Sequence, residues 1–127
     1  MKNRFNHIKT IILSAFLCCM VYNMQAQRAT EVYIPLGKSP GLSGKYCTMG
    51  KVETVNAATA VMTIKQGTEM KTCKITAGTE IYLDNSKRKL PNKKGSVADI
   101  KQGLMVEVKY KDNKPDGLIE WVKVQFE

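Results

Sequence analysis

Short runs of alternating apolar and polar residues dominate the chain after residue 45. The clearest lies at 104–110, where Leu104, Val106, Val108 and Tyr110 alternate with less apolar or charged residues. A period of two is typical of a strand with one buried face. Reading the rest of the chain in the same way predicts strands at 46–55, 60–65, 69–75, 79–83, 104–110 and 118–126.

Glycine, proline and small polar residues separate these runs. Gly67 and the segment 115–117 predict tight turns, and Gly50 predicts a bend inside the first strand. The segment 96–100 predicts one helical turn, because Ser96 precedes Asp99 by three residues in a capping pattern. In the last strand the apolar phase slips, which predicts a bulge near Trp121 that keeps Ile119 and Trp121 facing the same core as Val122 and Val124.

This order of elements predicts a mainly β fold, a small five- to six-stranded OB-like Greek-key barrel with one short helical turn. The barrel spans residues 46–127 and follows an irregular lead-in at 28–45, which we expect to dock through its apolar residues at 32–36. The predicted core consists of Val52, Val55, Met62, Ile64, Ile75, Ile81, Leu104, Val106, Val108, Val122 and Val124.

The first 26 residues have the pattern of a secretory signal peptide. Lys2, Arg4 and Lys9 give a positively charged start, the run at 8–22 is almost wholly apolar apart from Lys9, Thr10 and Ser14, and the small residue Ala26 favours cleavage next to Gln27. The run is short for a spanning helix, although an uncleaved anchor or lipid attachment at Cys18 or Cys19 are alternatives. We therefore expect a protein of the periplasm, cell envelope or extracellular space that is not an integral membrane protein once the signal is removed.

Positive charge is concentrated in one short segment of the expected mature protein. Three of the 20 basic residues and none of the 11 acidic residues lie in 1–26, which leaves the remainder with a net charge of +6. The concentrated cations are Lys87, Arg88, Lys89, Lys93 and Lys94. They are candidate contacts to an anionic polymer or surface, with Tyr82 and Trp121 as candidate aromatic contacts; a merely solubilising loop is the alternative. Nucleic acid is not an expected partner of an exported protein.

The residue types argue against an enzyme. The single histidine, His7, falls in the signal, so the mature chain lacks imidazole for acid–base catalysis, for a serine triad or for metal binding. Ser86 and Lys89 have the spacing of a serine acylase motif without its companion motifs. We expect no cofactor and predict a non-catalytic binding or structural module, whose partner is an envelope protein or an anionic polymer.

Sulfur provides an alternative function. Cys47 and Cys73 are the cysteines after the signal, and either a disulfide between them or two buried thiols fits their pattern. Thiolate and thioether groups suit Cu(I), so a periplasmic carrier of this soft metal is the second hypothesis. Its candidate ligands are Cys47, Met49, Met62, Met70 and Cys73.

Six segments carry a resemblance to exported bacterial OB-like domains of unknown function. They are 50–56 (GKVETVN), 62–65 (MTIK), 79–82 (TEIY), 97–103 (VADIKQG), 106–110 (VEVKY) and 119–124 (IEWVKV). The resemblance implies a fold and an envelope location, with no catalytic residue. The expected strand order also resembles that of small periplasmic copper and silver chaperones, which bind metal through a histidine and methionines with a tryptophan nearby.

Overall fold

The computed structural model describes residues 31–126 of the 127-residue chain. The predicted signal peptide, its cleavage position and the alternatives at Cys18 and Cys19 lie outside these residues. Within this range, residues 32–126 belong to one compact unit. Within the described part, no helix is both long and apolar enough to cross a bilayer.

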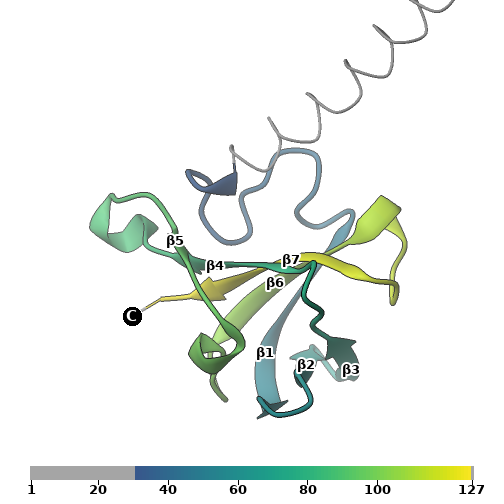
Figure 1. Ribbon diagram of the computed structural model, residues 1–127. Coiled ribbons are helices and arrows are strands. Elements are labelled where there is room, and N and C mark those ends of the chain that lie inside the picture. Colours follow the sequence, from purple (N-terminus) through teal and green to yellow (C-terminus); the bar gives the residue numbers. More distant parts are fainter. Residues whose placement is uncertain (1–30, 127) are drawn as a thin grey trace, which may run out of the picture. The chain divides into compact units, whose positions relative to one another are not determined.

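Seven strands and three short 3-10 turns make up this unit (Figure 1). The strands are β1 (Cys47–Asn56), β2 (Val61–Gln66), β3 (Glu69–Lys74), β4 (Glu80–Asp84), β5 (Lys93–Lys94), β6 (Met105–Tyr110) and β7 (Ile119–Gln125). The turns are η1 (Ser86–Arg88), η2 (Val97–Asp99) and η3 (Lys111–Asn113). All six predicted strands are present within one or two residues. The additional strand, β5, consists of two lysines, so the sequence contains no apolar alternation that could predict it.

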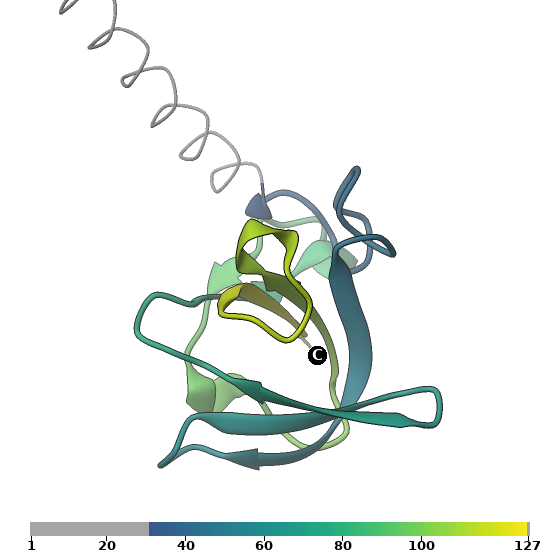
Figure 2. The same cartoon turned by 90° about the vertical axis from the view of Figure 1, so that its right-hand side faces the viewer.

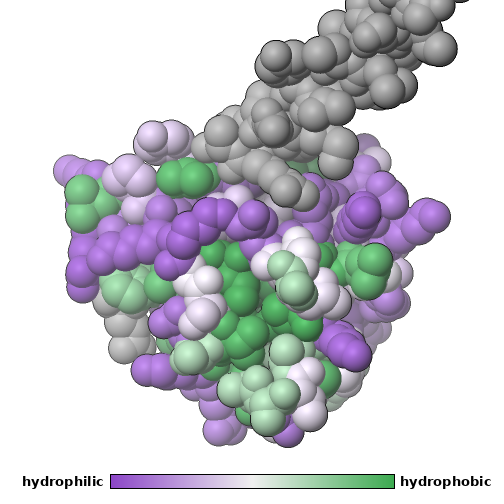
Figure 3. All heavy atoms as spheres, viewed as in Figure 1, coloured by the Kyte–Doolittle hydropathy of each residue, from purple (hydrophilic) through white to green (hydrophobic). Residues whose placement is uncertain are grey.

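The strands form one mixed sheet in the order β3-β2-β1-β6-β7-β4-β5. Neighbours are antiparallel except β4 and β7, which are parallel. The sheet bends around the core (Figure 2), but β3 and β5 remain its two edges and the ladder is not closed. The mainly β prediction is therefore confirmed. On the face shown in Figure 3, apolar side chains reach the surface between hydrophilic ones.

The core agrees closely with the alternation in the sequence. Nine of the eleven predicted core residues are buried, whereas Val55 and Leu104 are only partly buried against the core. Gly50 permits close approach of β1 and β2, because a Cβ there would lie 2.7 Å from the Lys65 carbonyl oxygen. The core also contains five residues that the list of predicted core residues omitted: Cys73, Leu83, Ile100, Tyr110 and Ile119.

The predicted bulge in β7 is present, but it does not turn Trp121 inward. Lys109 pairs with Trp121 and Tyr110 pairs with Ile119, which leaves Glu120 as the extra residue. Ile119 therefore enters the core with Val122, whereas Trp121 faces the other side of the sheet with Lys123, whose ammonium lies 4.9 Å from the centre of the indole ring. The expectation that Trp121 faces the core is wrong, because the extra residue changes the face of only one part of the strand.

The capped turn forms as expected. Ser96 and Asp99 make a reciprocal capping box around η2, with the Ser96 amide donating to the Asp99 carboxylate at 2.7 Å. The pairing fixes the chain direction just before β6 and places Ile100 in the core.

The lead-in is held by polar contacts with the face of the sheet that points away from the core, which we call the outer face. The Gly37 amide donates to Glu107 Oε2 at 2.7 Å, and the Ser43 hydroxyl donates to Glu107 Oε1. The Lys123 ammonium donates to Ser39 Oγ at 3.2 Å. Glu107 and Lys123, direct cross-strand neighbours, are both completely buried. Of the expected apolar docking residues, Val32, Ile34 and Leu36 are partly buried, whereas Tyr33 is exposed.

Candidate ligand-binding surface

The concentrated cations lie on one loop, residues 85–94, which we call the basic loop. It connects β4 to β5, and the pairing of Tyr82 with Lys94 and of Leu83 with Lys93 brings its two ends together. Across its base, the Asn85 amide donates to Asn92 Oδ1 at 3.1 Å. The loop contains five basic and no acidic residues. The structure thus places these five cations on one connected loop.

The basic loop is also tied to the lead-in. Asn92 donates through its backbone amide to the Val32 carbonyl at 2.7 Å and through its side chain to the Ile34 carbonyl at 2.9 Å. Asp84, just before the loop, accepts from the amides of Leu36 and Ser86, each at 2.9 Å. These bonds leave the loop little freedom to rearrange when a ligand arrives.

The carboxylate at the start of the loop is held ionised. Burial on its own would raise the pKa of Asp84, but the hydrogen bonds from Ser86 and Leu36, together with the charge of Lys123, outweigh it and lower the pKa. Asp84 therefore stays a firm acceptor for the lead-in over the neutral range.

The five cations of the loop have different surroundings. Lys87, Arg88 and Lys89 are exposed on and just after η1. Lys94 forms an ion pair with Glu80 and lies 5.0 Å from the centre of the Tyr82 ring, so part of its charge is compensated. Lys87, Arg88 and Lys89 are consecutive and exposed, so their charges add in front of this part of the loop.

Arg88 and Lys93 both lie against Phe126. The Arg88 guanidinium carbon is 5.3 Å and the Lys93 ammonium 5.5 Å from the centre of this ring. Cation–π contacts of this kind contribute roughly 0.5–1 kcal/mol each at exposed sites. Phe126 thereby connects the basic loop to the end of the last strand, a contact that the sequence pattern did not predict.

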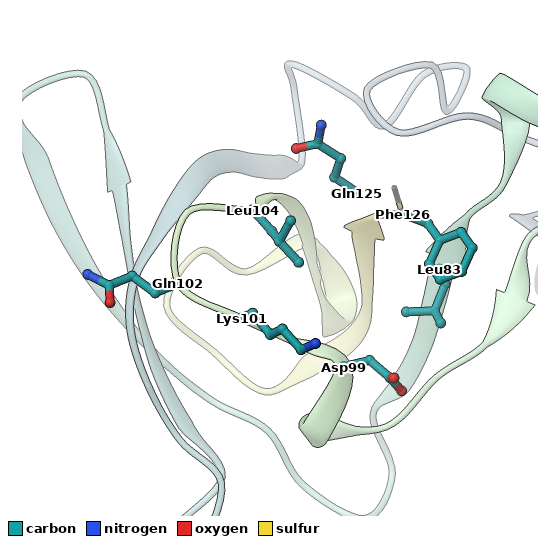
Figure 4. Close-up of a pocket in the computed structure, with 7 residues that line it drawn as sticks. All are labelled: Leu83, Asp99, Lys101, Gln102, Leu104, Gln125 and Phe126. Atoms are coloured by element: carbon teal, nitrogen blue, oxygen red, sulfur yellow. The ribbon is translucent and has the colours of Figure 1, made fainter.

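Phe126 also lines a cavity of about 260 Å³. In Figure 4, Leu83 and Phe126 form one wall, and the Lys101 ammonium points toward Asp99. The Gln102 amide points away from the centre in the same view. Small-molecule sites usually enclose about 300 Å³ or more, so this hollow has the size of a subsite for one small group.

Two exposed apolar side chains lie beside Lys89 of the basic loop. Tyr33 is 74% and Leu90 54% exposed. Together with Ser86, Lys89 and Pro91 they line a hollow of about 360 Å³. Sequence reasoning missed this pair, although Leu90 and Pro91 interrupt an otherwise polar loop. No sequence signal places Tyr33 there, since its position depends on the hydrogen bonds of Asn92 to the lead-in.

The two predicted aromatic contacts are covered. Tyr82 is 2% and Trp121 3% exposed, so neither ring is open to a ligand in this structure. Both belong to the outer face of the sheet, beside Lys123 and Glu107. The lead-in contacts this face through Ser39 and Gly37. The region predicted to be an exposed aromatic surface is therefore a buried layer that contains polar groups.

The buried charged groups on the outer face make their hydrogen bonds and ion pairs with other groups of the same chain. Besides Glu107 and Lys123, Lys109 is 5% exposed and donates to the Tyr110 carbonyl at 2.6 Å. Its ammonium also lies 3.4 Å from a Glu120 carboxylate oxygen. A buried charge is tolerated only when it is paired and hydrogen-bonded, so we assign these groups to holding the structure together.

The sulfur atoms do not converge on one metal site. Cys47 and Met49 lie on the outer face, opposite Lys109 and Glu107 of β6. Met62 and Cys73 are cross-strand neighbours in the core, and Met70 is 56% exposed on β3. Among the described residues, no three His, Cys, Asp or Glu side chains gather in a way that could hold a metal.

The two cysteines after the signal are not joined by a disulfide in the structure. Cys47 lies on β1 and Cys73 on β3, with β2 between them, and they face opposite sides of the sheet. Burial, the largest influence, raises the pKa of Cys73, whose Sγ lies 3.8 Å from the Tyr110 hydroxyl. The disulfide alternative therefore has no support from this arrangement, whereas a buried thiol describes Cys73 well.

Comparisons of the chain with protein-family models, with curated proteins and with solved structures found no match. The resemblance to exported OB-like domains thus stays a prediction from the sequence, and the function must be inferred from the surface itself.

Proposed function

We propose that this protein is a non-catalytic binding module of the bacterial cell envelope and that it binds an anionic polymer or surface through the basic loop. One observation carries the proposal: five cations without an acidic residue lie on a loop held in place by Asn85 and Asn92. A fixed cluster of like charges attracts anions over a distance comparable to the Debye length, about 10 Å at 0.1 M salt.

The envelope location and the OB-like fold are parts of the same proposal. The signal pattern of residues 1–26 supports export. The pairing of β1 with both β2 and β6, the parallel pairing of β4 with β7 and the capped turn before β6 support an OB-like arrangement. Loops and strand faces of such folds commonly bind polymers, which agrees with a loop-borne site.

Binding of a soluble polyanion tests the proposal. Polyglutamate is titrated into the chain starting at residue 27 and into the K87S/R88S/K89S variant. With roughly 1 kcal/mol for each cation near an anionic surface, the triple variant should bind about 100-fold more weakly. The matched control is K51S/K65S/K74S, which removes the same charge from exposed lysines on β1, β2 and β3.

The control separates a local site from a general effect of net charge. We expect the control variant to bind within about three-fold of the unchanged protein, because its lysines lie on strands away from the loop. Equal losses in the two variants would show that binding follows net charge alone. No binding by the unchanged protein would refute the proposed function.

A further inference from the structure

We infer that the anionic partner is a lipid bilayer surface, and that Leu90 and Tyr33 enter its interfacial layer while the neighbouring cations contact lipid phosphates. The inference rests on the proposed function and specifies its partner. It depends on a feature of the basic loop that charge alone does not explain, namely the two exposed apolar side chains next to Lys89.

Their exposure is selective. Among the described residues, the exposed large apolar side chains are Tyr33, Met70, Leu90 and Leu118. Two of these four border the same hollow, in contact with the segment that holds Lys87, Arg88 and Lys89. A soluble polyanion offers nothing apolar to these side chains, whereas the headgroup region of a bilayer accepts leucine and tyrosine together with lysine and arginine.

The chemistry of each side chain suits an interface. Tyrosine combines an apolar ring with a polar hydroxyl and is enriched where membranes meet water. Lysine and arginine place their charges at the phosphates while their methylene stems stay among apolar groups. Leu90 is followed by Pro91, which has no backbone N–H to desolvate. The tip of the loop therefore enters the interfacial layer at a small polar cost.

The loop is already shaped for this contact. Lys89 adopts the left-handed backbone conformation at the end of η1 and donates its amide to the Ser86 carbonyl at 2.8 Å. Asn92 holds Tyr33 next to the loop by bonding to the residues on either side of it, Val32 and Ile34. Two segments far apart in the sequence thus present one surface, and little conformational entropy is lost on binding.

Cosedimentation with vesicles tests the inference. The chain starting at residue 27, shown to be folded by circular dichroism and a cooperative thermal transition, is mixed with vesicles of phosphatidylglycerol and phosphatidylcholine in equal parts. Vesicles of phosphatidylcholine alone serve as the neutral comparison. Binding is measured for the unchanged protein, for Y33S/L90S and for the matched control M70S/L118S, which alters the two other exposed apolar side chains.

We expect binding to the anionic vesicles only, weakened about 10- to 30-fold by Y33S/L90S and unchanged by M70S/L118S. Polyglutamate binding should be the same for all three proteins, because the cations are intact. A second variant, L90W, should show a shift of tryptophan emission to shorter wavelength when anionic vesicles are added, against the constant contribution of buried Trp121.

The other outcomes are distinct. If polyglutamate binds but the anionic vesicles do not, or if Y33S/L90S binds the vesicles as well as the unchanged protein does, the bilayer is not the partner and the proposed polyanion function stands. If neither the vesicles nor polyglutamate bind, both proposals fail. An L90W emission unaffected by bound vesicles would overturn the insertion of Leu90.

Discussion

Replacing Glu107 by glutamine should destabilise the protein strongly, although the side chain keeps its shape. Glu107 is completely buried and accepts hydrogen bonds from the Gly37 amide and the Ser43 hydroxyl. Glutamine keeps one oxygen and places an NH2 group where the other oxygen lies, so the Ser43 hydroxyl or the Gly37 amide can no longer donate to that position. The neutral side chain also removes the negative charge beside Lys123, which is completely buried too.

The size of the effect follows from this arrangement. Losing a hydrogen bond to a charged acceptor costs about 1.5–3 kcal/mol, and losing the attraction between the buried charges of Glu107 and Lys123 adds to it, so E107Q should cost about 3 kcal/mol. For a domain of this length each kcal/mol lowers the melting temperature by about 4–8 °C, so E107Q should lower it by at least about 12 °C. The same change at Glu69, an exposed residue of β3, should alter stability by less than about 0.5 kcal/mol.

Urea unfolding monitored by Trp121 fluorescence gives the free energies, and a double-mutant cycle with K123M isolates the coupling. The two single losses should add up to about 2 kcal/mol more than the loss in E107Q/K123M, because each single variant loses the attraction between the two charges, which the double variant loses only once. If E107Q costs less than about 1 kcal/mol, or if the two losses simply add, the buried charges do not hold the lead-in as described.

Three further predictions concern titration and thiol chemistry. The pKa of Asp84 is lowered in the folded protein, so the ionised carboxylate stabilises the fold above the unfolded pKa of about 4, and this stabilisation is lost as the pH falls below that value. Acid unfolding of the D84N variant should lack this pH-dependent contribution. Burial raises the pKa of Tyr110 to about 12, so the protonated hydroxyl stabilises the fold below about pH 10, and this stabilisation is lost as the pH rises toward 12. Alkaline unfolding curves of the Y110F variant should not show this loss. In the native protein, Ellman's reagent should modify half-buried Cys47 well before buried Cys73, and equal rates in native and urea-unfolded protein would contradict the assigned burial.

The sequence predicted the strands because each has one buried face. In β6, Val106 and Val108 occupy the core, and the alternation with Glu107 and Lys109 is plain in the sequence. The same alternation led to a wrong prediction of the exposure of the other face. Glu107 and Lys109 read as solvent-exposed residues, but both are buried. A period of two identifies two faces without saying whether another segment covers the polar one.

The aromatic candidates failed for the same reason. Tyr82 and Trp121 were expected to be available to a ligand, yet they lie on the outer face where the lead-in is bound. That contact depends on hydrogen bonds between residues about 70 to 84 positions apart, such as Gly37 with Glu107 and Ser39 with Lys123. The residues near each partner in the sequence do not indicate such long-range hydrogen bonds.

The basic loop could be predicted because its residues are consecutive in the sequence. Lys87, Arg88 and Lys89 need only a turn to share one surface. The position of Tyr33 beside Leu90 could not be predicted, because it requires Asn92 to bridge two distant segments. The distinction is general for surface sites: clustered charge is visible in a sequence, whereas its apolar companions are assembled by the fold.

Mapping the bound ligand on the backbone tests the binding role of the basic loop most directly. The isotope-labelled chain from residue 27 is titrated with polyglutamate while its amide resonances are followed by NMR. The largest shifts should fall on residues 85–94 and disappear at 1 M salt, where the Debye length is only about 3 Å. Shifts concentrated on β2 and β3 instead, or no shifts at any residue, would contradict the assignment of the basic loop as the binding surface.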